Sequence, residues 1–240
     1  MVENKLNTMK TTFLKKLLLC VVTIGALSSC SLDSENDYVS YPQPEAAYGI
    51  IANASPASGD LFFFADANKI NDNALTFATA AGYYNFTLGN RILAVKNASG
   101  TTLATKAVTL TRGQSFTAFA VNTFNNIEIV TYRDSLTSAT ASKAYVRFIN
   151  LSPDAAPINI TGTTQTFATG LAFKQATPFI EVSGGNYDFT YKATATQDTL
   201  AQDRSVALRA GKIYTIYTKG FTTPPTGSND TFSTKVIPHN

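Results

Sequence analysis

The sequence repeats itself, and this repeat constrains the fold more than any other feature. Four segments of the first half align, in order, with four segments of the second half. The aligned pairs are YGIIANASP (48–56) with YVRFINLSP (145–153), GNRILAVK (89–96) with GNYDFTYK (185–192), TLA (102–104) with TLA (199–201), and LTRGQSFT (110–117) with LRAGKIYT (208–215). Collinear matches at nearly constant spacing indicate two copies of one module. We predict modules at residues 46–138 and 139–240, joined by DSLTSATASK (134–143), each able to fold alone.

Short segments of β-type composition fill each copy. Tyr187, Phe189 and Tyr191 alternate with Asp188 and Thr190, which is the period of a strand with one buried face. In the second copy the predicted strands are AYVRFINL, PINI, TPFIEV, NYDFTYKA, TLAQDRSVAL and KIYTIYTK. About seven short strands per hundred residues is typical of an immunoglobulin-like sandwich. The sequence therefore predicts an all-β fold of two tandem immunoglobulin-like β-sandwich modules.

Each copy carries the same Asn-x-Ser-Pro phrase after its first strand. The phrase comprises Asn53, Ser55 and Pro56 in the first copy, and Asn150, Ser152, Pro153 and the following Asp154 in the second. Proline cannot donate to a strand ladder, and Ser and Asp side chains can bind turn amides. We interpret the phrase as a structural turn that ends the strand.

The first 29 residues read as a secretory signal peptide, with translation starting at Met1 or Met9. Lysines precede an apolar run, Leu17 to Leu27, that is too short to span a bilayer. The run ends in LSSC, which resembles the bacterial lipobox, so Cys30 is the predicted lipidated first residue of the mature protein. Residues 30–45 then form a lipidated tether. Cys20 is removed with the signal, so no disulfide is expected.

The residues after Cys30 bear on the location of the protein. Ser31 stands where an Asp would favour retention in the inner membrane, so resemblance to other Gram-negative lipoproteins points to the outer membrane. Asp33, Glu35 and Asp37 resemble a cell-surface export signal, and an ordinary solvated tether explains them equally well. We expect an outer membrane lipoprotein on the cell surface, with the periplasmic face as the alternative.

The formal net charge of +3 comes from the signal peptide. Four basic residues and one acidic residue precede Cys30, so the mature chain keeps 15 of 19 basic and 15 of 16 acidic residues and has no net charge. Binding to nucleic acid requires a basic stripe, which this chain lacks. Nucleic acid is therefore not an expected partner.

The segments YVRFINLSPDAAPINI and LRAGKIYTIYTKG resemble the bacterial domain of unknown function (DUF) 4397 family, found in secreted and lipid-anchored proteins. The resemblance covers most of residues 46–240 and is looser in the first copy. The family pattern often has His where this chain has Asn150 and Asn53. The family has no established activity, so the resemblance implies a fold and a setting rather than a reaction.

Few side chains suit catalysis. The one histidine, His239, is penultimate, in a tail expected to fray. Because the one histidine lies in this tail and no free cysteine is expected, no Ser-His or Cys-His nucleophile and no zinc site is expected. Glycoside hydrolysis needs only a pair of carboxylates, and the candidates are Asp154, Glu181, Asp188 and Asp203. The simpler interpretation of these four residues is that they are solvated surface side chains. We predict no enzyme activity, no metal and no cofactor.

Two weaker signals concern the surface. The tripeptides DSL (134–136) and DTL (198–200) resemble a periplasmic O-glycosylation acceptor, which makes Ser135 and Thr199 candidate modification sites. The clusters LFFF (61–64) and GYYNF (82–86) are either core strands or an exposed aromatic platform.

These observations favour a lipid-anchored envelope protein with a non-catalytic binding or adhesion role. Its expected partners are the membrane, through the lipid, and a glycan or an extracellular or envelope protein. A structural spacer or envelope-assembly subunit with no soluble ligand is the alternative, and a glycan-active hydrolase is a distant third.

The lipobox makes one direct prediction. Cys30→Ala should release the protein from the membrane fraction, because the acyl chains that anchor it attach at that thiol. Fractionation and metabolic labelling with radioactive palmitate test this. A wild-type protein that takes up no label would show that the site is not used.

Overall fold

The computed structural model describes residues 45–134 and 141–239, which belong to one compact unit, Pro42–Asn240. The predicted signal peptide, Cys30, Ser135 and all of the tether but Glu45 lie outside the described residues. The predicted join at 134–143 lies mostly outside them, so the module boundaries stay a prediction. Within the described residues, no helix has the length and apolar character needed to cross a bilayer.

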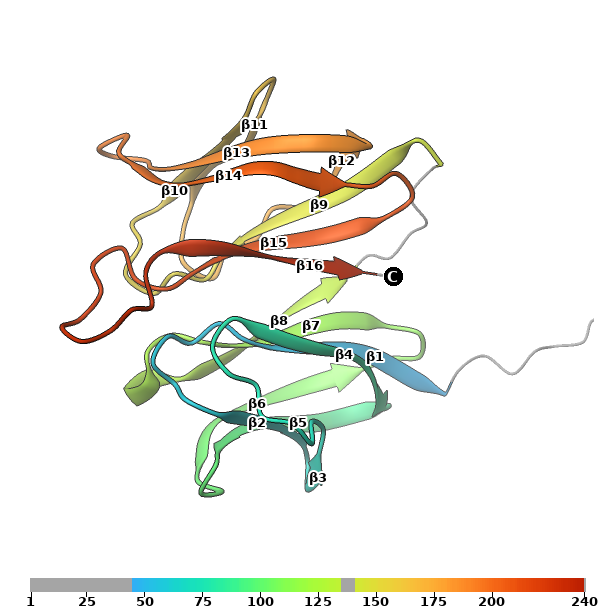
Figure 1. Ribbon diagram of the computed structural model, residues 1–240. Helices are drawn as coiled ribbons and strands as arrows, with labels where there is room; N and C mark the ends of the chain where they lie inside the picture. Colours follow the sequence, from blue (N-terminus) through green and yellow to red (C-terminus); the bar gives the residue numbers. More distant parts are fainter. Residues whose placement is uncertain (1–44, 135–140, 240) are drawn as a thin grey trace, which may run out of the picture. The chain divides into compact units, whose positions relative to one another are not determined.

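In residues 45–134 the first module has eight strands and one short 3-10 turn, Phe124–Asn126 (Figure 1). The strands are β1 (Ala46–Asn53), β2 (Leu61–Ala65), β3 (Asn68–Lys69), β4 (Thr79–Thr87), β5 (Gly89–Asn97), β6 (Thr102–Leu110), β7 (Ser115–Val121) and β8 (Glu128–Asp134). One sheet has the order β4-β1-β7-β8, and we call it inner sheet 1; the other, β3-β2-β5-β6, is outer sheet 1. All pairs are antiparallel except β1 with β7, which run parallel.

The second module repeats this plan. Its strands are β9 (Lys143–Asn150), β10 (Ile158–Gly162), β11 (Thr166–Leu171), β12 (Ile180–Ser183), β13 (Gly185–Ala193), β14 (Thr199–Leu208), β15 (Ile213–Lys219) and β16 (Ser233–His239). Inner sheet 2 has the order β12-β9-β15-β16, with β9 and β15 parallel, and outer sheet 2 has the order β11-β10-β13-β14. The starts of β1 and β9 lie 97 residues apart, those of β5 and β13 lie 96, and those of β7 and β15 lie 98. The predicted fold class, two tandem β-sandwich modules, is confirmed.

Two strands of the second module were not predicted from the sequence. Strand β11 contains Gly170 at a φ of 64°, and its pairing with β10 shifts register twice, so its alternation is irregular. Strand β16 contains Pro238, which argues against a central strand. It is tolerated because β16 lies at the edge of inner sheet 2.

Each module has its own core between its two sheets. In the first, Leu61, Phe63 and Val95 of the outer sheet meet Ile51 and Phe116 of the inner sheet. The second core holds a cluster of rings, in which Phe148, Phe167 and Phe189 lie with centroids 5.1–5.2 Å apart. Such tilted and edge-on contacts are the favoured geometry for aromatic rings.

A third core joins the two inner sheets. Residues 116–121 of β7 and 213–218 of β15 are all buried, because one face of each strand packs in its own sandwich and the other against the neighbouring module. Phe119 and Tyr217, both fully buried, meet edge-on with ring centroids 5.0 Å apart. The other buried members of this junction core are Ile50, Ala52, Ala54, Val121, Ile149, Leu151 and Ile237.

The junction core refines the expectation that each module folds alone. Residues 141–240 carry a complete sandwich core, but alone they would expose Ile149, Leu151, Tyr217 and Ile237. We therefore expect this fragment to fold by circular dichroism and to self-associate with increasing concentration in sedimentation velocity, because exposed apolar faces of this kind drive association. Residues 31–240 serve as the control and should stay monomeric. A fragment that is unfolded, or monomeric at all concentrations, would contradict this prediction.

Candidate functional site

The Asn-x-Ser-Pro phrase of the first module fastens the end of β1 to its surroundings. The side-chain oxygen of buried Asn53 accepts a hydrogen bond from the backbone N–H of Ser55 at 3.0 Å, and its amide group donates to the carbonyl of Leu75 at 3.0 Å. The Ser55 hydroxyl donates to the carbonyl of Asn122 at 2.6 Å. Asn122 follows β7, so the phrase ties the end of one strand to the turn after its parallel partner.

The second copy of the phrase makes the equivalent contacts. Asn150 accepts from the N–H of Ser152 at 3.2 Å and from the hydroxyl of Thr218 at 2.8 Å, and it donates to Leu171. The Ser152 hydroxyl donates to the carbonyl of Gly220 at 2.6 Å, the counterpart of the bond to Asn122. Both asparagines use acceptor and donor atoms at once, and both serines are buried. In this structure the phrase has the geometry of a turn.

The residue after each proline reaches the same loop, residues 220–232 between β15 and β16. The carboxylate of Asp154, after Pro153, accepts from the backbone N–H groups of Thr222 and Thr223 at 2.8 and 2.9 Å and from the Thr222 hydroxyl. In the first module Ala57, after Pro56, donates its N–H to the carboxylate of Asp230 at 2.7 Å. The two copies of the phrase therefore hold one loop from opposite modules.

A cleft opens where these loops meet. It has a volume of about 620 Å³ and lies between the first module's phrase, the 3-10 turn after β7 and the loop after β15. Phe124, on its rim, is 42% exposed. A second groove of about 410 Å³ runs between residues 78–82, at the start of β4, and residues 235–238 of β16.

The remaining acids proposed from the sequence have separate partners. Glu181 accepts from the Tyr145 hydroxyl at 2.9 Å, and Asp203 accepts from the hydroxyls of Tyr191 and Thr234 at 2.8 Å. Asp188 binds the N–H of Ser205 and the Arg204 guanidinium, and these bonds lower the pKa of its carboxyl. Across residues 45–134 and 141–239, no three His, Cys, Asp or Glu side chains are grouped as a metal site would need.

The structure bears on one of the two candidate O-glycosylation sites and on both aromatic clusters. Thr199 is the exposed first residue of β14. In LFFF, Leu61 and Phe63 are core residues, whereas Phe62 and Phe64 point outward, with the Lys69 and Lys96 ammonium groups 4.1 and 4.3 Å from their ring centroids.

The second aromatic cluster is not an exposed platform. Phe86 belongs to the first module's core, Tyr84 packs against that core, and Tyr83 packs against the junction core.

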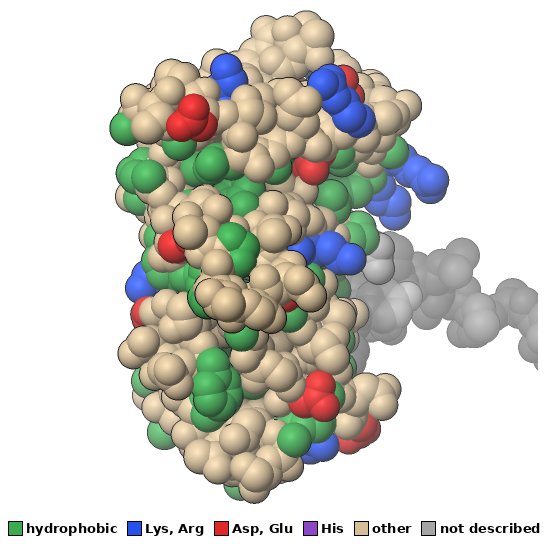
Figure 2. Space-filling model, turned by 60° about the vertical axis from the view of Figure 1, so that its left-hand side comes forward, with side chains coloured by type: hydrophobic (Ala, Val, Ile, Leu, Met, Phe, Trp, Pro, Cys, Tyr) green, Lys and Arg blue, Asp and Glu red, His purple; other side chains and the backbone are tan. Residues whose placement is uncertain are grey.

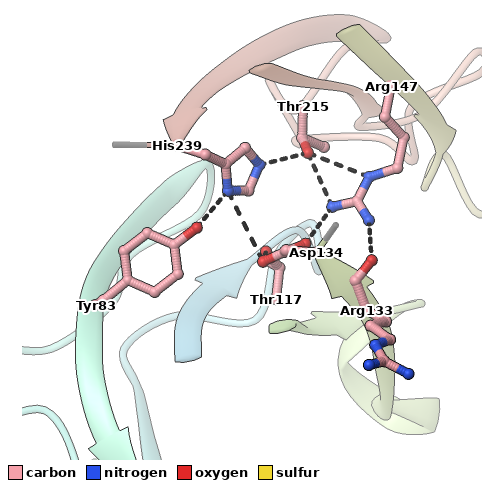
Figure 3. Close-up of polar contacts among 7 residues, drawn as sticks. All are labelled: Tyr83, Thr117, Arg133, Asp134, Arg147, Thr215 and His239. Carbon is pink, nitrogen blue, oxygen red and sulfur yellow. Dashed lines mark hydrogen bonds and ion pairs between the residues drawn. The ribbon is translucent and has the colours of Figure 1, made fainter. Parts of the chain in front are cut away.

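Sequence reasoning missed a buried polar network at the module junction (Figure 3). Arg147 of β9 and Asp134, the last residue of β8, form an ion pair of 2.7 Å whose side chains are 4% and 0% exposed. The Thr117 hydroxyl donates to the same carboxylate at 2.8 Å, and Arg147 also donates to the carbonyl of Arg133. One sequence signal was present: Arg147 interrupts an apolar strand, and a cation there needs a partner. The partner's identity was hidden because it comes from the other module.

The expectation of a fraying tail at His239 is wrong. This residue ends β16 and is 1% exposed, because β16 pairs along its whole length with β15. Its Nε2 lies 2.7 Å from the Thr215 hydroxyl and its Nδ1 2.6 Å from the Tyr83 hydroxyl (Figure 3). Thr215 already accepts two hydrogen bonds from Arg147, so its proton is directed to Nε2. The proton of the neutral imidazole is therefore on Nδ1, facing Tyr83.

A scan against family models matches the description "Domain of unknown function (DUF4397)" at residues 50–161 and 144–238. The chain belongs to the DUF4397 family. The two matched segments correspond to the two modules and overlap across β9 and β10. In this DUF4397 protein Asn53 and Asn150 are both buried beneath the turn they stabilise.

A search of the curated proteins found no match. Among solved structures, the fimbrial anchor protein Mfa2 from Porphyromonas gingivalis matches at 11% identity, over 80% of this chain and 97% of that chain, with a TM-score of 0.22. A score this low carries no conclusion about fold or function.

The burial of His239 predicts a pH dependence of stability. Desolvation lowers the pKa of His239 to about 4, and the neighbouring Asp134 carboxylate opposes this only in part. The unfolded chain binds this proton near pH 6.5, whereas the folded chain binds it only near pH 4. The free energy of unfolding therefore keeps its full value above pH 6.5 and decreases as the pH falls towards 4. The loss amounts to about 3 kcal/mol.

Urea unfolding between pH 7.5 and 4.5 measures this loss. The control is His239→Gln, which keeps a donor and an acceptor but does not titrate in this range. An unchanged difference in unfolding free energy between the two proteins across the range would refute the prediction.

Proposed function

We propose that this DUF4397 protein is a lipid-anchored envelope protein with a non-catalytic binding or adhesion role. The lipobox at Cys30 and the proline-containing tether of the sequence support an anchor in the outer membrane and display at the cell surface. In this proposal the anchor holds the protein at the membrane, and the paired modules present the binding surface.

The observation that carries the proposal is the cleft built by loops of both modules. A site assembled from two modules binds well only if the modules are held in a fixed relation, because ordering them on binding would cost affinity. Here the junction core, the Asp134–Arg147 pair and the Ala57–Asp230 bond supply that fixation. A further ion pair across the junction joins Lys174 to Glu128 at 2.9 Å.

The chemistry of the described side chains supports a non-catalytic role. His239 is buried and held neutral, so it cannot reach an external substrate. The acids Asp154 and Asp203 bind backbone amides and hydroxyl groups of their own module, which is a structural use of a carboxylate.

A structural spacer is the competing proposal, and the junction core favours it equally. Two modules joined by a continuous apolar interface form a stiff unit, and a spacer needs stiffness but no ligand. The two proposals differ in whether the cleft is occupied.

A combined array of glycans and extracellular-matrix proteins, probed with soluble residues 31–240, separates them. A binding protein should give reproducible signals that compete with unlabelled protein, and deletion of the gene should reduce cell adhesion. Blank arrays together with unchanged adhesion would reject the binding role and leave the spacer.

A further inference from the structure

We propose that the cleft between the loop 122–127 and the loop 220–232 binds a neutral glycan. This inference rests on the proposed binding role and adds the place and the chemical class of the ligand.

The cleft is held in shape before any ligand arrives. Asp230 fixes the loop 220–232 to Ala57, which adopts a φ of 58°, a left-handed conformation that is unusual for alanine. At the base of the loop, Gly220 has a φ of 76°, and a Cβ there would lie 2.2 Å from the carbonyl oxygen of Thr231, so only glycine fits. The loop is further closed by hydrogen bonds between Phe221 and Asp230 and between Phe232 and Phe221.

The lining combines an exposed ring with free amide and hydroxyl groups. Phe124 is one of two large apolar side chains exposed among the described residues, and its ring offers a flat surface for the C–H face of a sugar. The side chains of Thr123, Asn125, Thr226 and Asn229 lie around it and, within the described part of the chain, make no hydrogen bond to protein. Asp230 binds Ala57 through Oδ2, which leaves Oδ1 to accept from a hydroxyl group.

The charge around the cleft selects for a neutral ligand. The segments 54–60, 122–127 and 220–232 contain no Lys or Arg, and their only charged residues are Asp60 and Asp230. The lining itself contains no Lys or Arg, so an anionic polysaccharide or a phosphate would find no cation in it and would face the Asp230 carboxylate. The nearby Lys219, whose charge interacts with that of Asp230, donates its ammonium group to the Ser233 hydroxyl instead. Figure 2 turns this side of the molecule forward and shows a surface that is mostly tan, with scattered hydrophobic, acidic and basic side chains.

The repeat shows that the fold does not require the loop that forms the cleft. The first module connects β7 to β8 through residues 122–127, whereas the second connects the equivalent strands through residues 220–232. The extra residues include Pro225, Thr226, Ser228 and Asn229, all of which line the cleft. The sandwich itself therefore does not require the extension, and apart from the bond of Asp230 to the first module its residues are available to form a site.

Titration of residues 31–240 with neutral oligosaccharides, followed by ¹⁵N NMR, tests the proposal. The probes are cellohexaose, xylohexaose, mannohexaose and maltohexaose, with polygalacturonate as the anionic comparison. We expect at least one neutral probe to shift the amides of residues 122–126 and 225–230, and polygalacturonate to shift none of them. Phe124→Ala should weaken that binding roughly tenfold, and Asn229→Ala should weaken it as well.

Matched controls separate the cleft from the rest of the surface. Ile92→Ala truncates the other exposed large apolar side chain, on outer sheet 1, and Asn186→Ala removes an exposed amide on β13; neither should change binding. All four variants should keep the wild-type melting temperature. If Phe124→Ala and Asn229→Ala leave saccharide binding unchanged, the saccharide does not bind in the cleft and the inference is wrong, but the proposed binding role stands.

No shift with any neutral probe would overturn the inference as well. In that case signals from proteins on the array would leave the proposed function standing, and a blank array together with unchanged adhesion would remove both.

Discussion

The packing of inner sheet 1 against inner sheet 2 is the interaction on which the rest of the structure depends. It turns two sandwiches into one unit with three cores, and it buries both faces of β1, β7, β9 and β15. Burying a large apolar side chain contributes about 1.5–3 kcal/mol, so Phe119, Tyr217, Ile149 and Leu151 together make the junction a substantial share of the stability. The polar network lies at this junction and is therefore also shielded from water. For this reason His239 is neutral and the Asp134–Arg147 pair is almost unexposed.

A buried ion pair adds orientation more than net stability. Removing one partner of such a pair costs about 3–5 kcal/mol, because the other charge is left in a dry site, although an apolar pair can do as well. Asp134 and Arg147 come from different modules and are bracketed by Thr117 and Thr215 at equivalent positions of β7 and β15. In the observed packing of the inner sheets this charge pair forms, and Ala57 also reaches Asp230 beside the cleft.

The duplicated phrase shows how one sequence element acquired two uses. In both modules the Ser hydroxyl ties the end of the first strand to the loop after its parallel partner, and the Asn side chain stabilises the turn itself. The next residue differs: Asp154 holds the loop of its own module, and Ala57 receives the same loop from the other module. The phrase thus stabilises each sandwich and also positions the loop on which the proposed function depends.

Much of the fold was predictable from local pattern, and the site was not. Short alternating segments, Gly and Asn turns and the offset of 96–98 residues determined the two all-β modules, because strand period and turn chemistry are properties of neighbouring residues. Strands β11 and β16 were not predicted, because Gly170 and Pro238 break the alternating pattern. These segments are strands only because they pair with β10 and β15. The partner of Arg147, the burial of His239 and the cleft at Ala57 and Asp230 depend on contacts between residues 13 to 173 positions apart in the chain. Such contacts exist only once the two inner sheets have packed, so the tertiary structure alone decided them.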